Sequence, residues 1–289
     1  MSSPTAKSSG KLDEKQVKAL VSLLADDDPA VYRTVRQKLV SYGPIAAHWV
    51  GEHRLSNDPV LRRHAQEIIQ FFSRQEADTQ LLAFCLNQGE DFNLEQGALL
   101  LSRTQYPEIN LEAYSALLDH LAGELRDRLD LNGDPVQILG VMADYLFSEK
   151  GFAGDETNFH DPENSYLNRV LDRRKGSHIS LSVVYLLLAR RLKLPVVGIG
   201  LPGHFVCRYQ CSRQEIYIDP FRKGRLLAKA DCVKYVAQLR HPFDESCLAP
   251  VSARRILLKI CVNLHQIYTH LKSPVHSERL QRYLVALAK

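Results

Sequence analysis

A histidine and an aspartate stand where two neighbouring strands could bring them together. His204 opens the apolar run HFVCRY, and Asp219 closes the run EIYID, with a polar tip between the two runs. Both runs have the composition of short strands joined as a hairpin. A hydrogen bond from an aspartate would fix the tautomer of the imidazole, as a general base requires. The alternatives are a structural histidine at position 204 and a turn-forming Asp-Pro pair at position 219.

An expected helix begins shortly before these strands. Gly176 is expected to end the preceding helix as its C-cap, and Ser177 is placed to act as the N-cap of a helix over 178–193. The start of a helix lowers the pKa of a thiol, so a nucleophilic cysteine would belong there. The sequence supplies Ser177, His178 and Ser180 instead. Ser177 is most simply a cap, since a serine nucleophile would need a strong base such as His204.

Other polar residues surround this helix start. Asn158, Asn164, Asn168 and His178 could line a binding pocket, or the asparagines could serve as turn and cap residues. Cys207 is not expected to replace the missing nucleophile, because strand alternation places it on the face opposite His204.

The chain divides by pattern into four parts. Residues 1–12 are polar and predict a disordered tail, and 13–149 read as helices throughout. Residues 150–228 mix two helices with the strand-like runs VVGIG, HFVCRY and EIYID, and 229–289 return to helix.

Two of the first helices begin with an Asp-Pro pair. Asp28-Pro29 and Asp58-Pro59 each place a cap residue before a first-turn proline. Paired helices of this kind resemble HEAT-type repeats. Further helices are expected at about 75–87, 94–104, 111–129 and 134–148.

Composition narrows the classes of function. The chain has 289 residues, 45% of them hydrophobic, and a net charge of +4 with both signs interleaved. This pattern favours a globular protein with solvated helix faces over a nucleic-acid binder. Six cysteines lack paired metal-ligand spacing and read as free thiols of a cytoplasmic protein. We expect no metal, no cofactor and no membrane segment, and the sequence leaves the oligomeric state open.

The segment from 158 to 225 resembles the transglutaminase-like superfamily. The matching pieces are NSYLNRVLDRRKG, ISLSVVYLLLARRLKLPVVGIGLPGHF and IDPFRKG, and the stretch 93–129 resembles a helical leader. The closer resemblance is to the SirB-type invasion-regulator family, which implies a tetratricopeptide-like C-terminal end.

The resemblance implies a site made of cysteine, histidine and aspartate. Carried onto this chain, the histidine falls on His204 and the aspartate on Asp219. The cysteine position falls on Ser177 or Ser180, depending on the alignment, and neither is a cysteine.

These observations predict an α+β protein. We expect a HEAT-like N-terminal helical array packed on a transglutaminase-like, papain-like core of helix plus antiparallel sheet, followed by C-terminal helices. The leading hypothesis for function is a pseudoenzyme that binds a protein or peptide partner. The alternative is a hydrolase or acyltransferase using Ser177 or Ser180 with His204 and Asp219, and a third hypothesis is a structural module of a larger assembly.

Overall fold

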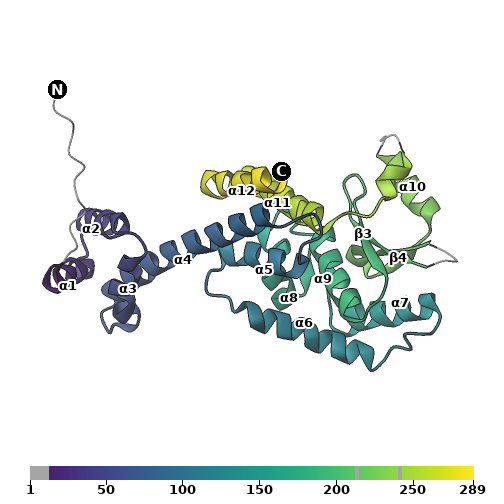
Figure 1. Cartoon of the computed structure of the whole chain (residues 1–289), viewed down its shortest axis with the longest axis horizontal. Helices are drawn as coiled ribbons and strands as arrows, with labels where there is room; N and C mark the ends of the chain where they lie inside the picture. Colours follow the sequence, from purple (N-terminus) through teal and green to yellow (C-terminus); the bar gives the residue numbers. More distant parts are fainter. Residues whose placement is uncertain (1–12, 212–214, 240–242) are drawn as a thin grey trace. The chain divides into compact units, whose positions relative to one another are not determined.

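A computed structural model describes residues 13–211, 215–239 and 243–289 (Figure 1). The expected tail at 1–12 lies outside the described residues. The chain forms two compact units, which divide at Glu76 and Ala77.

The first unit is built from helices around a small apolar core. Asp28 and Asp58 cap their helices as expected, each accepting a hydrogen bond from the backbone N–H two residues on. Leu39 and Ile68 are among its fully buried side chains. The helices are α1 (Glu14–Ser22), α2 (Pro29–Ser41), α3 (Ile45–Gly51) and the first part of α4 (Pro59–Asn87), with 3₁₀ turns at Leu23–Ala25 and Glu52–Leu55.

Helix α4 is longer than the sequence pattern indicates. A separate helix was expected at about 75–87, but α4 runs without a break from Pro59 to Asn87. No glycine or proline stands between Val60 and Asn87, so nothing in the backbone chemistry interrupts the helix.

The second unit contains further helices and two sheets. No strand occurs in the described part of the chain before Ala153. The helices are α5 (Leu94–Gln105), α6 (Leu111–Arg126), α7 (Pro135–Ala143), α8 (Leu167–Arg173), α9 (His178–Arg191), α10 (Lys229–Gln238), α11 (Ala253–His270) and α12 (Pro274–Leu287). Shorter turns are a π-helical turn at Asp144–Glu149 and 3₁₀ turns at Pro162–Asn164, Pro220–Arg222 and Glu245–Leu248.

The larger sheet is antiparallel and follows the order β3-β4-β5-β6. Its first three strands correspond to the three expected runs, although His204 precedes β4 by two residues rather than opening it. The strands are β3 (Val196–Ile199), β4 (Val206–Gln210), β5 (Glu215–Asp219) and β6 (Arg225–Leu227).

A second, two-stranded sheet was not expected. In it, β1 (Ala153–Gly154) pairs in parallel with β2 (Lys175–Gly176). Gly176 is therefore a strand residue and not the C-cap of α8. The C-cap is Arg174, which has a left-handed backbone with φ of 55°.

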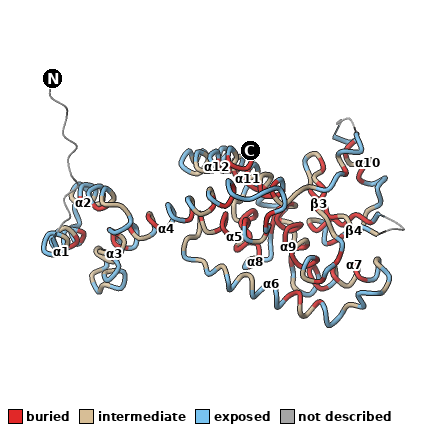
Figure 2. The backbone as a smooth tube through the Cα atoms, in the orientation of Figure 1, coloured by how far each residue is buried: buried red, intermediate tan, exposed pale blue. Residues whose placement is uncertain are grey.

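Helix α9 passes through the middle of the second unit's core. Its residues from Ile179 to Tyr185 are all buried (Figure 2). Side chains of α5, α6 and α7 share one apolar cluster with α9 and with β4 and β5. The expected boundary between a helical array and the core, at 149/150, therefore differs from the division at 76/77, because the helices after Ala77 pack directly on the core.

Candidate functional site

Both candidate serines are engaged at the start of α9. Ser177 is the N-cap, as expected, and its hydroxyl accepts a hydrogen bond from the Ser180 N–H at 3.3 Å. The Ser180 hydroxyl donates to the Asn164 carbonyl at 2.6 Å, and the two serine oxygens lie 3.2 Å apart. Within the described residues, no hydrogen bond joins either hydroxyl to His204. The serines therefore hold the helix start in place.

His204 and Asp219 lie side by side, as the hairpin predicts. His204 Nε2 and Asp219 Oδ2 are 2.9 Å apart, and Asp219 is 1% exposed. Since a carboxylate only accepts hydrogen bonds, Nε2 carries the hydrogen and Nδ1 keeps its lone pair in the neutral ring. Asp219 also caps the turn after it, because its Oδ1 accepts from the N–H groups of Phe221 and Arg222. The pairing and the Asp-Pro turn are thus both correct interpretations.

His178 is the residue of the α9 start that faces this pair. The ring centroids of His178 and His204 are 5.0 Å apart. Burial, then the nearby His204, lowers the pKa of His178 to about 4, with Lys259 acting in the same direction and Asp219 against it. Its Nδ1 atom is buried and finds no hydrogen-bond partner among the described residues. His178 is therefore a neutral imidazole with a free ring nitrogen.

The sequence hypotheses gave His178 only a binding role. The sequence signal that could have shown the orientation of His178 is the pair Ser177 and Ser180. Once the hydroxyl of the N-cap bonds to the third helical residue, both serines face the cap. The intervening His178 then points in another direction.

The asparagines form part of the scaffold around the helix start. Asn164 Nδ2 donates to the Asn158 carbonyl at 2.9 Å and to Asp155 Oδ2 at 3.3 Å. The Ser177 N–H donates to the Asn164 carbonyl at 2.9 Å, so Asn164 anchors the start of α9. The side-chain oxygens of Asn164 and Asn168 are buried and without a partner in the described structure. Asn158 is exposed.

Cys207 lies away from the imidazole pair, in line with strand alternation. Its thiol is fully buried, with Sγ 3.8 Å from the Ser182 carbonyl. Burial raises the pKa of Cys207 far above its usual range, so this thiol is inert. In the described structure, none of the six cysteines forms a disulfide.

A cavity of about 240 Å³ opens beside the pair. His204 and Asp219 form part of its wall, and Tyr235 of α10 lies with its ring centroid 5.5 Å from that of His204. The rest of the lining includes the cationic residues Arg222, Arg225 and Lys234 and the acidic residue Asp231.

No group of three or more His, Cys, Asp or Glu side chains with metal-binding geometry occurs in the part of the chain that the structure describes. His178 and His204 supply two imidazoles, and Asp219 already accepts three hydrogen bonds. Likewise, no described helix combines the length and apolarity of a membrane span.

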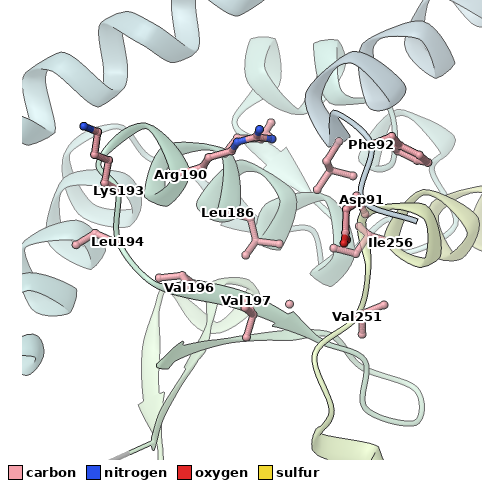
Figure 3. Close-up of a pocket in the computed structure, with 14 residues that line it drawn as sticks. Asp91, Phe92, Leu186, Arg190, Lys193, Leu194, Val196, Val197, Val251 and Ile256 are labelled. Atoms are coloured by element: carbon pink, nitrogen blue, oxygen red, sulfur yellow. The ribbon is translucent and has the colours of Figure 1, made fainter. Parts of the chain in front are cut away.

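A second cavity, of about 520 Å³, lies at the opposite end of α9 (Figure 3). It is bounded by the C-terminal half of α9, by β3 and by the start of α11. Leu186, Val196 and Ile256 contribute apolar surface to it.

The fold and the site define a class that sequence comparison also identifies. Residues 112–262 match the transglutaminase-like superfamily. The match covers just over half of the chain, and the chain belongs to this superfamily.

Relatives that match include bacterial UPF0162 proteins and the human F-box only protein 21. A UPF0162 protein of Xylella fastidiosa (strain 9a5c) is 34% identical over 191 residues, which cover 63% of this chain and 66% of the relative, just under two thirds of its length. A UPF0162 protein of Pseudomonas aeruginosa is 30% identical over 198 residues, or 66% of this chain and 70% of the relative. Human F-box only protein 21 is 26% identical over 234 residues, or 70% of this chain and 36% of that protein. No solved structure matches the chain.

Proposed function

We propose that this chain is a pseudoenzyme of the transglutaminase-like superfamily, which uses the cleft at His204 to bind a segment of a protein or peptide. The observation that carries the proposal is His178, which faces the His204–Asp219 pair from the helix start where a thiol nucleophile would belong. An imidazole at this position cannot supply the thiolate nucleophile of such a site. With a pKa of about 4, His178 is also uncharged near neutral pH.

The cleft offers groups that suit peptide recognition. His204 lines the cavity, and its Nδ1 atom is a hydrogen-bond acceptor when the ring is neutral, so it can receive an N–H group of a bound backbone. The cations of the cavity wall, among them Arg225 and Lys234, complement carbonyl oxygens or a carboxylate. The helices of the first unit, proposed to be HEAT-like, would offer a binding surface of their own.

The protein would then be related to the SirB-type family, with α11 and α12 as a tetratricopeptide-like C-terminal end. It would act in the cytoplasm. The proposal includes no cofactor and no nucleic acid.

The serine hydrolase alternative has weaker support. For either serine to attack a substrate, its hydroxyl must leave the hydrogen bonds that cap α9. Ser180 would also leave the Asn164 carbonyl, a buried acceptor. Such a loss costs about 1–3 kcal/mol before any chemistry begins.

Hydrolysis of activated esters and peptide amides tests the two alternatives. We expect the wild type and the variants His204→Ala, Ser177→Ala and Ser180→Ala to give the same background rate. Working acyl-transfer sites lose orders of magnitude when the base or nucleophile is removed. A rate abolished both by His204→Ala and by one serine variant would refute the pseudoenzyme proposal.

Binding is tested separately, by selecting octapeptides from a displayed random library on the full chain. At least one class of selected peptides should lose about tenfold or more in affinity in His204→Ala and in Lys234→Glu. Lys272→Glu, an exposed charge reversal after α11, is the control. If no selected peptide responds to His204→Ala, the cleft does not bind peptides.

A further inference from the structure

Strand β3 is an edge strand with one side only partly covered. It pairs with β4 alone within the larger sheet. On its other side, the Val251 N–H donates to the Gly198 carbonyl at 2.9 Å, and Ile199 forms an isolated antiparallel bridge with Pro250. The chain then leaves the edge, because α11 begins at Ala253.

The backbone of β3 therefore keeps unused hydrogen-bonding groups. Because the Gly198 carbonyl points away from β4, strand alternation directs the backbone of Val196 to the same free side. The neighbouring Pro195 faces β4, because its carbonyl accepts a hydrogen bond from the Gln210 N–H at 2.8 Å. This agrees with Val196 facing the opposite, free side. The Val196 N–H is taken up by the Leu194 carbonyl at 2.8 Å. Among the described residues, the Val196 carbonyl and the Gly198 N–H, two residues apart, have no backbone hydrogen-bond partner and can pair with an incoming strand.

The cavity of about 520 Å³ lies along this free edge (Figure 3). Leu186 reaches from α9 toward β3, and Val251 and Ile256 close one end. This surface suits apolar side chains at alternate positions of an extended segment.

Charge on the rim of the cavity is unbalanced. Arg190 and Lys193 are exposed at the end of α9, and neither side chain forms an ion pair within the described ranges. Asp91 is the acidic residue of the same lining and lies at the Val251 end (Figure 3). An acidic side chain on the bound segment would meet Arg190 and Lys193.

We propose that β3 accepts an extended segment of a partner protein as an added strand, with alternating apolar residues in the cavity and an acidic residue against Arg190 and Lys193. Main-chain bonds to Val196 and Gly198 supply the pairing, and the cavity and the two cations select the sequence. This surface is separate from the cleft at His204, so the proposal stands or falls independently of the function proposed above.

The test uses the same displayed octapeptide library, selected on the full chain. We expect a class of peptides with alternating apolar residues and a flanking Asp or Glu. Their affinity, measured by fluorescence anisotropy of the labelled synthetic peptides, should fall about tenfold or more in the double variant Arg190→Glu, Lys193→Glu. Backbone N-methylation of the peptide at an inward-pairing residue should cause a loss of similar size, since it removes a main-chain donor.

Lys272→Glu is a closely matched control. Lys193 and Lys272 each follow a helix by two residues, with φ of 58° and 53°. Their charge reversals therefore place the same strain on the backbone, and Lys272→Glu should leave the affinity unchanged.

Several results would overturn the proposal. One is the absence of any such peptide class. Another is a loss of peptide affinity in Lys272→Glu equal to that in the double variant. A third is a peptide affinity that N-methylation leaves unchanged. Loss in His204→Ala instead of the double variant would assign the peptides to the cleft. A concentration-dependent dimer, seen by sedimentation and broken by the double variant, would make a second copy of this chain the occupant.

Discussion

The imidazole rings of His178 and His204 lie 5.0 Å apart, centroid to centroid, at an interplanar angle of 54°. His204 is held from its other side by Asp219, so its Nδ1 faces away from the carboxylate. A helix start, an imidazole and a carboxylate thus lie together, as in the thiol site that the resemblance implies. We propose that His178 stands where the nucleophile of such a site would be.

Restoring a thiol at this position should restore its reactivity. In His178→Cys, the helix start and His204 should both lower the pKa of the new thiol. We expect iodoacetamide near pH 6.5 to label this cysteine about tenfold or more faster than the six native cysteines, as followed by peptide mass spectrometry. The rate should collapse in His178→Cys, His204→Ala.

Ser177→Cys and Ser180→Cys are the controls for that experiment. Both serine hydroxyls face the helix cap. Thiols at these positions should therefore react no faster than ordinary buried cysteines. Fast labelling at 177 or 180 that depends on His204 would place the nucleophile position at that residue and not at 178.

The low pKa of His178 should make stability depend on pH. Its pKa is about 4 in the folded protein, against an ordinary value of 6.5. The unfolded chain therefore binds the extra proton between these values, and the folded state loses stability as pH falls from about 6.5 toward 4. Between pH 8 and pH 5, this residue should lower the free energy of unfolding by about 1–2 kcal/mol.

Urea denaturation at the two pH values measures this contribution. In His178→Phe, the difference between pH 8 and pH 5 should shrink by about 1–2 kcal/mol. His204, Asp219 and Lys259, the ionisable groups that act on His178, remain in the variant. His48→Gln, at an exposed site on α3, should not change the difference. An unaltered difference in His178→Phe would mean that the pKa of His178 in the folded protein lies near its ordinary value of 6.5.

The sequence predicted the parts of the site that depend on local chemistry. The pairing of His204 with Asp219 follows from two strands in sequence order, and the cap at Ser177 follows from its residue type. The orientation of His178 depends on which way the first turn of α9 faces the sheet, which no local pattern specifies. The pairing of β1 with β2 joins two-residue segments more than twenty positions apart, too short to show periodicity.

The carboxylate of Asp219 should control the tautomer of His204. In Asp219→Asn, the amide oxygen can still accept from the N–H groups of Phe221 and Arg222. The amide nitrogen then faces His204 Nε2 and must donate to it, so the ring hydrogen moves to Nδ1. We expect the side-chain ¹⁵N shifts of His204 to exchange their pattern, with a loss of about 1–3 kcal/mol in stability. Unchanged ¹⁵N shifts would show that Asp219 does not set the tautomer.

A buried arginine should be among the most sensitive positions for stability. Arg254 is 6% exposed, and its guanidinium donates to carbonyl groups at the ends of α4 and α12. Its acceptors are the carbonyls of Cys85, Gln88, Ala286 and Leu287, at 2.7–3.1 Å.

Arg254→Met should therefore destabilise the protein by about 3 kcal/mol, because it leaves buried carbonyls at helix ends without a donor or a compensating charge. The neighbouring Arg255→Met, at an exposed site with no side-chain hydrogen bond in the described structure, should change stability by less than about 0.5 kcal/mol. Urea denaturation of the two variants makes the comparison. Equal effects at the two positions would mean that the carbonyls around Arg254 find water or other donors, and that the guanidinium does not tie these helix ends together.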